Sequence, residues 1–366
     1  MSQANASSNE TQFDVFAKVA RYDHEQILIC QDNHTGLKAI IAIHNTVLGP
    51  GLGGTRMWKY ATEAEAINDA LRLSRGMTYK AAISGLNLGG AKAVIIGDPA
   101  KDKSEHLMRK FGRFVENLGG KYVTAEDVGT TTRDMEYVKM ETDHVVGLPE
   151  IMGGGGDPSP VTAYGVYMGI KASAKKAYGS DSLSGKKVAV QGAGKVGLHL
   201  IELLHKEGAK VIATDIFESG LKIAADKYSA TIVKPEEIFG QDVDIFAPCA
   251  LGAILNTENI NSLKCRIIAG AANNQLEDDT IHGDMIKAKG ILYAPDFLIN
   301  AGGLINVYSE YNGYVREIAF SQTENIYNTV LNIYKKSEEE NINTQLAAIK
   351  LAEKRVYDTM VLQSKI

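Results

Sequence analysis

The chain has few cysteines and no long apolar run, and each shortage excludes a class of protein. Its three cysteines, Cys30, Cys249 and Cys265, are an odd number without a CxxC pair, so neither a disulfide framework nor a thiolate zinc site is indicated. The eight histidines form no HExxH or HxxxH pattern, and we expect no bound metal. Charged residues interrupt each apolar segment before it reaches the length of a membrane helix.

Basic charge is also scarce. The 39 Lys and Arg residues are outnumbered by 44 Asp and Glu residues, for a formal net charge of -5, so no basic face for a nucleic-acid backbone is expected. The opening segment MSQANASSNETQF lacks the basic start and apolar core of a secretory signal. We therefore expect a cytoplasmic protein that binds neither nucleic acid nor a membrane.

The length of 366 residues exceeds what one hydrophobic core usually supports, so two domains with a cleft between them are expected. The sequence GGGGDPSP at residues 153–160 disfavours regular structure and indicates a hinge. We predict a nucleotide-binding domain over residues 151–330. Residues 1–150 plus 331–366 are predicted to form a second domain for substrate binding and oligomerisation.

Local patterns predict an α/β fold in both domains. After residue 187, the β-rich runs VAVQ, VIATD, ATIV, DIFA, RIIAG and ILYA alternate with helical segments, which predicts a doubly wound parallel sheet of the Rossmann type. In the first domain, the runs QILIC and LKAIIAIH flank a turn and predict a mixed sheet. Thr62 and Glu65 form a capping box that opens a helix, which we expect to end near Gly76.

A glycine fingerprint follows the first strand of the predicted Rossmann domain. Residues 192–197 read GAGKVG and match GxGxxG between a strand and a helix, the arrangement that binds a dinucleotide pyrophosphate. Asp215 ends the next strand, where its carboxylate can bind ribose hydroxyls and repel a 2′-phosphate, so NAD is predicted over NADP. The residues assigned to the cofactor site are Gly192, Ala193, Gly194, Lys195, Val196, Gly197, Asp215, Thr162, Ala250 and Asn273.

Three glycine-flanked segments of the first domain carry charge among apolar residues: MTYK with Lys80, LGGAK with Lys92, and TAEDVG with Asp127. Taken alone, each lysine is more simply a surface residue. Together with GGTRM at residues 53–57 and GDPSPVT at residues 156–162, these segments resemble the glutamate, leucine, phenylalanine and valine dehydrogenase family. The resemblance implies a homo-oligomer, hexameric or octameric, that reversibly deaminates an L-amino acid to its 2-keto acid and ammonia with NAD.

The resemblance also implies the roles of the three charged residues. Lys80 binds the substrate α-carboxylate, Lys92 is the catalytic lysine, and Asp127 is its proton-transfer partner. Hydride leaves the α-carbon only when the amine is neutral, and an activated water must then add, so a base near neutral pH is needed. Burial and a cationic neighbour such as Lys80 would bring Lys92 into that range, and its ammonium would stabilise the carbinolamine oxygen. Many relatives have a third glycine where this chain has Ala91, a change that we expect to be tolerated.

Substrate choice depends on the side-chain pocket. Glutamate-specific members of the family carry a lysine and a serine at the positions of Leu52 and Val307, and an apolar pocket cannot hold a distal carboxylate. We therefore predict leucine, valine and isoleucine as substrates, with broad activity because one methylene is worth only about 1 to 3 kcal/mol. The assigned substrate-binding residues are Lys80, Leu52, Gly53, Met77, Ala125, Leu304, Val307 and Asn274. Without the family, core packing would explain the leucines and valine, and a turn would explain the asparagines.

Three other functions are compatible with parts of this pattern. Phenylalanine dehydrogenase would use the same catalytic residues and differ in pocket volume. A catalytically silent nucleotide-binding regulator would keep the glycine fingerprint and lose Lys80, Lys92 and Asp127. A hydroxy-acid dehydrogenase would pair a histidine with a carboxylate and bind the substrate carboxylate with an arginine; no such histidine is found, and Arg56 is interpreted as structural.

Overall fold

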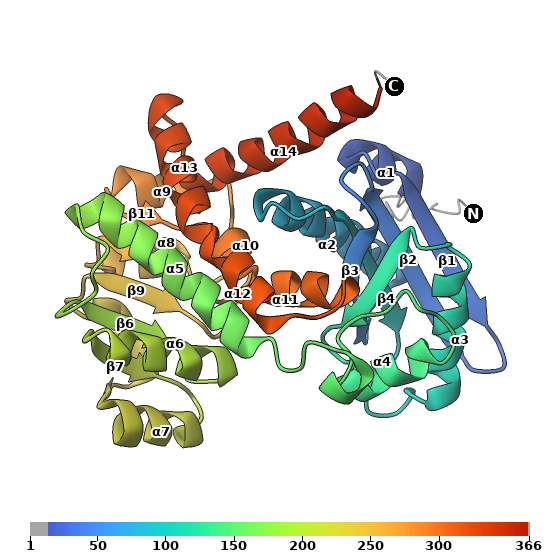
Figure 1. Cartoon of the computed structure of the whole chain (residues 1–366), viewed down its shortest axis with the longest axis horizontal. Helices are drawn as coiled ribbons and strands as arrows, with labels where there is room; N and C mark the ends of the chain where they lie inside the picture. The colour runs from blue at the N-terminus through green and yellow to red at the C-terminus, as the bar shows by residue number, and fades with distance from the viewer. Residues whose placement is uncertain (1–13, 365–366) are drawn as a thin grey trace, which may run out of the picture. The chain divides into compact units, whose positions relative to one another are not determined.

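The computed structural model describes residues 14–364, so the prediction about the opening segment concerns residues outside the described part. The chain divides into two compact units. The first consists of Met1–Thr46, Gly51–Met77 and Gly90–His144, and the second of Val47–Pro50, Thr78–Gly89 and Val145–Ile366. Each unit is built around one β-sheet (Figure 1).

The first unit contains a five-stranded mixed sheet in the order β1-β2-β4-β3-β5. Its strands are β1 (Gln26–Asp32), β2 (Leu37–Asn45), β3 (Gly51–Trp58), β4 (Gly89–Ile96) and β5 (Tyr122–Glu126). The hairpin of β1 and β2 is antiparallel, as is the pairing of β2 with β4, whereas β3 and β5 are parallel. The predicted mixed sheet is confirmed. The helices of this part of the chain are α1 (Val15–Tyr22), α2 (Glu63–Ile83), α3 (Glu105–Glu116) and α4 (Thr132–Lys139).

Helix α2 packs its small apolar face on the sheet and is longer than predicted. Ala66 and Ala70 are fully buried against a cluster that includes Val94 of β4. The predicted capping contact is present, since the Glu65 N–H donates to Thr62 Oγ1 at 3.1 Å. The predicted end near Gly76 was wrong, because a helical glycine costs only about 1 kcal/mol and packing of the helix on both sides of it outweighs that cost. The end of α2 at Ile83 places Lys80 in its final turns.

The second unit contains a six-stranded sheet in the order β11-β10-β9-β6-β7-β8. The strands are β6 (Lys187–Gln191), β7 (Lys210–Thr214), β8 (Thr231–Ile232), β9 (Ile245–Pro248), β10 (Ile267–Ile268) and β11 (Leu292–Tyr293). All its neighbouring pairs are parallel. This is the doubly wound order, with a topological switch beside β6 where ligands bind. The six predicted strands and the Rossmann architecture are confirmed.

Helices connect these strands and follow the last one. The helices between the strands are α6 (Lys195–Lys206), α7 (Glu218–Tyr228), α8 (Thr257–Ser262) and α9 (His282–Ala288), with the 3-10 turn η2 (Pro235–Gly240). The 3-10 turn η1 (Glu150–Met152) and α5 (Ser159–Tyr178) come before β6, and α10 (Asp296–Ile299) follows β11. The later helices are α11 (Gly302–Tyr311), α12 (Arg316–Glu324), α13 (Ile326–Glu339) and α14 (Thr344–Gln363). Residues 154–158, within the predicted hinge, have no helix or strand, as expected from their glycines and prolines.

The last two helices belong to the second compact unit, whereas we predict residues 331–366 in the first domain. The reason is packing: Val330, Ile333 and Tyr334 of α13 are buried, and the Tyr334 hydroxyl lies 2.7 Å from Ser173 Oγ of α5. From α14, Arg355 donates to the carbonyl oxygens that end α2, among them Leu86 at 2.7 Å. The assignment of these residues to a domain by function stays a prediction.

Two features are absent from the part of the chain that the structure describes. None of its helices combines the length and the apolar character needed to cross a bilayer. No three His, Cys, Asp or Glu residues within 14–364 gather where they could hold a metal ion. The expectations about membrane and metal stay predictions.

Candidate active site

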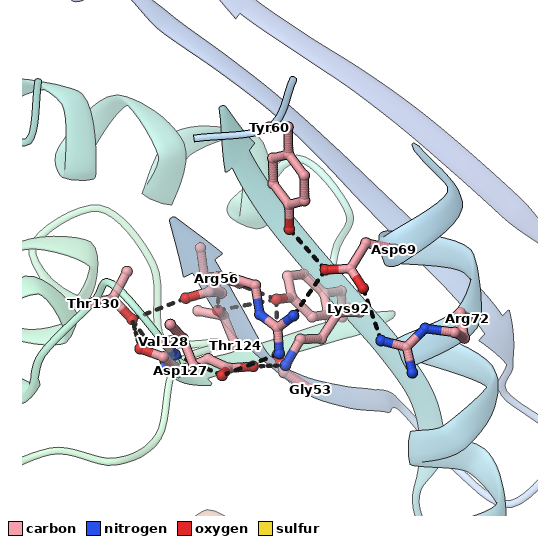
Figure 2. Close-up of polar contacts among 12 residues, drawn as sticks. Gly53, Arg56, Tyr60, Asp69, Arg72, Lys92, Thr124, Asp127, Val128 and Thr130 are labelled. Carbon is pink, nitrogen blue, oxygen red and sulfur yellow. Dashed lines mark hydrogen bonds and ion pairs between the residues drawn. The ribbon is translucent and has the colours of Figure 1, made fainter. Parts of the chain in front are cut away.

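Lys92 lies on β4 and is almost completely enclosed. It pairs across the sheet with Ala42 of β2, and only 5% of its surface is exposed. Its Nζ forms an ion pair with Oδ2 of Asp127, which directly follows β5 (Figure 2). A buried ammonium needs such a partner, because an isolated charge is costly to remove from water. The structure therefore joins two residues 35 positions apart into one amine–carboxylate pair.

Glycine in β3 makes this pairing possible. β3 lies between β4 and β5, so the Lys92 side chain must cross a strand, and neighbouring strands are about 4.8 Å apart. A Cβ at Gly54 would lie 3.0 Å from the Cβ of Asp127 and 2.4 Å from the carbonyl oxygen of Glu126. A side chain at position 54 would therefore displace the backbone that carries the carboxylate.

Asp127 is also oriented by its own loop. The Val128 N–H donates to Oδ1 of Asp127 at 2.6 Å, and the Asp127 N–H donates to Thr130 Oγ1 at 2.9 Å. Thr130 Oγ1 also lies 2.9 Å from the carbonyl oxygen of Thr55 in β3. These contacts direct Oδ2 toward Lys92 without depending on the lysine (Figure 2). The pair can pass a proton between nitrogen and oxygen, which is the requirement for acid–base chemistry.

The methyl group of Ala91 does not narrow the approach to Lys92. Successive side chains of a strand point to opposite faces, so Ala91 and Lys92 project to different sides of β4. Ala91 is fully buried, and a Cβ at Gly51 would lie 2.9 Å from its methyl carbon. The extra carbon is therefore accommodated against β3.

Further charged residues adjoin the pair. Arg56 of β3 donates from Nη1 to Asp69 of α2 at 2.8 Å, and its Nη2 lies 3.9 Å from Oδ1 of Asp127. Asp69 also accepts hydrogen bonds from the Tyr60 hydroxyl at 2.8 Å and from Arg72 at 3.0 Å (Figure 2). Sequence reasoning missed this network, because no local pattern links a strand residue to a helix residue 13 positions later.

In the second unit, Lys80 is held by a polar contact from a distant segment. Its Nζ donates to Oδ1 of Asn300 at 2.7 Å. Asn300 in turn donates to the Ala271 carbonyl oxygen at 3.1 Å and to Asn273 Oδ1 at 2.7 Å. Burial lowers the pKa of Lys80 to about 8, although the charge of Asp296 acts to raise it. Asn300 was not predicted, since an asparagine 220 positions from Lys80 carries no sequence signal for this contact.

The glycine fingerprint forms the turn between β6 and α6, within the second unit. Gly192 has φ 108°, and a Cβ at Gly197 would lie 2.0 Å from the Gly192 carbonyl oxygen, so both positions require glycine. A Cβ on Gly194, the N-cap of α6, would meet nothing within 4 Å. The space before this helix end is open, and no side chain caps the helix. These residues fit a pyrophosphate, because the backbone N–H groups and the dipole at a helix N-terminus attract anions.

Asp215 follows β7 and is fixed beside this turn. Its Oδ2 accepts from the Ala193 N–H at 2.6 Å and its Oδ1 from the Phe217 N–H at 2.9 Å. A Cβ at Gly192 would lie 2.8 Å from the Ala250 nitrogen, so Ala250 also adjoins the turn. Of the other assigned cofactor residues, Lys195 and Val196 begin α6, Thr162 lies in the first turn of α5, and Asn273 lies between β10 and β11. Their roles stay predictions.

Similarity to known proteins decides the family. The family model described as Glu/Leu/Phe/Val dehydrogenase, dimerisation domain, matches residues 24–144, and the model for Glutamate/Leucine/Phenylalanine/Valine dehydrogenase matches residues 153–219 and 216–364. The chain belongs to the Glu/Leu/Phe/Val dehydrogenase family. The resemblance that the sequence motifs predicted is confirmed.

Relatives within this dehydrogenase family are named for different amino-acid substrates. Leucine dehydrogenase from Bacillus cereus is 56% identical over 94% of this chain and 93% of the relative. Phenylalanine dehydrogenase from Bacillus thermotolerans is 47% identical over 94% of this chain and 91% of the relative. The crystal structure of L-tryptophan dehydrogenase from Nostoc punctiforme is 47% identical, with a TM-score of 0.86 over 95% of this chain and 100% of that chain. The chain is therefore an amino-acid dehydrogenase.

The substrate-binding residues assigned in the first unit are mainly apolar. Leu52 and Ala125, on the paired strands β3 and β5, are 2% and 8% exposed. Gly53 has no room for a side chain, since a Cβ there would lie 1.7 Å from the Ala91 carbonyl oxygen. Met77 is partly buried on α2. None of these four residues carries a positive charge that could bind the distal carboxylate of a glutamate substrate.

The residues assigned in the second unit are Leu304, Val307 and Asn274. Leu304 and Val307 are three positions apart on α11 and so share one face of the helix. Leu304 is buried and Val307 partly buried. Asn274 is exposed and has φ 51°, a left-handed conformation that asparagine tolerates. The turn geometry explains Asn274 without a ligand, so its substrate role stays a prediction.

Proposed function

We propose that this amino-acid dehydrogenase is a leucine dehydrogenase, which converts leucine, valine and isoleucine reversibly to 2-keto acids and ammonia with NAD. The observation that carries the proposal is the enclosed ion pair of Lys92 and Asp127, because the reaction needs a base that also returns protons. The 56% identity to a leucine dehydrogenase supports the substrate class. The apolar residues Leu52, Ala125 and Leu304 support it as well, because they cannot stabilise a charged substrate side chain.

The roles of the residues follow from the bonds that change. As an ammonium, Lys80 binds the substrate α-carboxylate as a point charge. The neutral substrate amine forms an iminium when hydride leaves the α-carbon. Lys92 then takes a proton from the water that adds to this carbon, and Asp127 shares the proton. The Lys92 ammonium stabilises the carbinolamine oxygen and then returns its proton to the substrate nitrogen. The C–N bond breaks to release ammonia, and the pair of Lys92 and Asp127 takes the hydroxyl proton as the keto group forms.

When bound, NAD supplies the nicotinamide ring that accepts the hydride. The open N-terminus of α6 at Gly194 would hold the pyrophosphate. Asp215 would accept hydrogen bonds from the ribose hydroxyls, and its charge would disfavour the 2′-phosphate of NADP. Thr162, Ala250 and Asn273 would complete the cofactor site.

The proposal is tested by NADH formation with leucine, valine, isoleucine, phenylalanine, tryptophan and glutamate at equal concentration. We expect kcat/KM for leucine to exceed that for glutamate by about 100-fold or more, because an apolar pocket leaves the glutamate side-chain charge without a partner. Valine and isoleucine are expected within about 10- to 100-fold of leucine, since they differ by one carbon or by branching. Glutamate as the best substrate would contradict the pocket assignment.

A second candidate is oxidation of aromatic amino acids. It is favoured by the 47% identity to proteins named phenylalanine dehydrogenase and L-tryptophan dehydrogenase. The same Lys92 and Asp127 would catalyse that reaction, so only pocket volume distinguishes the two. The same substrate series decides between them through the ratio of kcat/KM for phenylalanine to that for leucine.

Carboxylate binding is expected to weaken as the pH rises through about 8, the value to which burial lowers the pKa of Lys80. Below this pH Lys80 is an ammonium and attracts the carboxylate; above it the neutral amine does not. The inhibition constant of 4-methylpentanoate against leucine measures this step, because that carboxylate has no other group titrating there. We expect this inhibition constant to rise about tenfold per pH unit above the pKa of Lys80.

Lys80→Arg is the matched variant for this titration, because guanidinium stays charged throughout the range. In this variant 4-methylpentanoate is expected to bind more weakly at neutral pH than in the wild type, so its inhibition constant is higher. That constant is expected to be independent of pH up to about 10. A wild-type inhibition constant that stays level across the same range would exclude Lys80 as the carboxylate-binding cation.

We further propose that the protein is a homo-oligomer. Residues 24–144 match a segment described as a dimerisation domain. Whether the assembly is a hexamer or an octamer, and the cytoplasmic location, stay predictions. Light scattering of the purified protein measures the assembly directly.

A further inference from the structure

Two cations hold the carboxylate of Asp127 in the first unit. Oδ2 pairs with Lys92 from β4, and Oδ1 lies 3.9 Å from Nη2 of Arg56 on β3. Among residues 14–364, these are the charged side chains that form ion pairs with Asp127 (Figure 2). The catalytic carboxylate therefore faces a second cation, which the mechanism above does not use.

Arg56 is itself held in place by a carboxylate on α2. Its Nη1 donates to Asp69 at 2.8 Å, and the two side chains are 24% and 15% exposed. Burial alone would raise the pKa of Asp69, but donors from Tyr60, Arg56 and Arg72 lower it. Asp69 is thus kept anionic and fixes one end of the guanidinium. Because guanidinium is planar and rigid, fixing Nη1 also fixes where Nη2 points.

The guanidinium of Arg56 is held at the cost of one unpaired donor. The Nε of Arg56 is buried and has no hydrogen-bond partner in the described part of the chain. A buried donor without a partner destabilises a protein, and such exceptions call for an explanation such as function. Directing Nη2 toward Asp127 is an explanation that the geometry offers.

We propose that Arg56, anchored by Asp69, is a positioning residue that keeps Asp127 ionised and directed at Lys92 during proton transfer. This inference rests on the proposed function and adds a residue to its machinery. A cation beside a carboxylate favours its charged form. Arg56 would thereby sustain the state of Asp127 that takes a proton from Lys92.

The size of the effect is limited by solvent. Arg56, Tyr60 and Asp69 line a cavity of about 350 Å³, together with Trp58, Glu65, Asn68 and Val128. Water in such a cavity screens the charge of Arg56. We therefore expect a moderate effect on the rate, well below that of removing a group that reacts.

The test compares Arg56→Gln with Arg56→Lys. The glutamine variant loses the charge, and its kcat for leucine oxidation is expected to fall about tenfold, while the KM for NAD changes less than twofold. The acidic limb of its pH–rate profile is expected to move to higher pH, because both members of the coupled Lys92–Asp127 pair are more easily protonated without the neighbouring cation. Arg56→Lys restores a charge and is expected to recover most of the lost kcat.

Arg113→Gln is the matched control. Arg113 of α3 pairs with Glu141 at 2.8 Å, its side chain is 65% exposed, and it forms no ion pair with Asp69 or Asp127 among the described residues. Its kcat and pH profile are expected to match the wild type. Asp69→Asn removes the charge that holds Arg56 and leaves Asp127 unchanged. Its kcat is expected to lie between those of the wild type and Arg56→Gln. This variant carries the test if circular dichroism shows that Arg56→Gln does not fold.

The outcomes separate this inference from the proposed function. If the wild type oxidises leucine and the folded Arg56→Gln variant keeps its kcat and pH profile, Arg56 does not position Asp127. An equal loss in the glutamine and lysine variants, without movement of the acidic limb, also overturns the inference, since it indicates a packing role. A wild type that oxidises none of the six amino acids refutes the proposed function instead.

Discussion

Replacing Lys92 with alanine is expected to lower kcat for leucine oxidation by about 10³- to 10⁴-fold, because the base and the cation that stabilises the carbinolamine oxygen are lost together. The variant should fold, since Asp127 keeps its contacts with Val128 and Arg56. NADH formation measures kcat, and the quenching of protein fluorescence by NAD measures cofactor binding. The dissociation constant for NAD is expected to stay within about twofold of the wild type, because the glycine turn lies in the other unit.

Lys59→Ala is the control for this variant. Lys59 also forms an ion pair with an aspartate, Asp98 at 2.9 Å, but its side chain is 68% exposed. An exposed pair contributes little to stability, so both kcat and melting temperature should be near wild type. Turnover of Lys92→Ala at the level of Lys59→Ala would remove Lys92 from the mechanism.

Replacing Asp127 with asparagine is expected to lower kcat by about 10²- to 10³-fold. Asparagine has the same shape and can still accept the Val128 N–H bond made at 2.6 Å. It carries no charge and cannot take the proton, so the partner of Lys92 is lost while the loop is preserved. Single-turnover measurement of NADH formation separates this loss from any slowing of product release.

Asp143→Asn provides the comparison for Asp127→Asn. Asp143 pairs with Lys139 at 2.6 Å, and its side chain is 90% exposed, so its charge contributes little. We expect an unchanged kcat. A loss of less than threefold in Asp127→Asn, measured beside this control, would show that Lys92 works without the carboxylate.

The Rossmann sheet could be predicted from the sequence because its signals are local. Each β-rich run after residue 187 lies within a few residues of its turn or helix, and the turn at Gly192 and Gly197 needs glycine for steric reasons that any fold would impose. The end of α2 could not be predicted in the same way. Gly76 is a local stop signal, and burial of Ser74 and Thr78 against the rest of the protein overrides it.

The pairing of Lys92 with Asp127 was expected from family motifs, whereas the neighbours of this pair were not predicted at all. Lys92 and Asp127 stand in segments that resemble known ones, whereas Asp69 and Asn300 stand in segments with no such pattern. Arg56 was interpreted as structural, and its contacts with Asp69 and Asp127 were not predicted. A contact between a strand and a helix depends on how the two pack, which no spacing along the chain records.

The sequence by itself determined the α/β class, the glycine turn and the chemical groups available, because helices, strands and tight turns depend on residues that are near one another along the chain. Only the tertiary structure decided which groups meet. The order β4-β3-β5 brings Lys92 to Asp127 across glycine, and the packing of α2 on the sheet brings Asp69 to Arg56. Both contacts depend on strand order and close packing, which are properties of the whole folded chain.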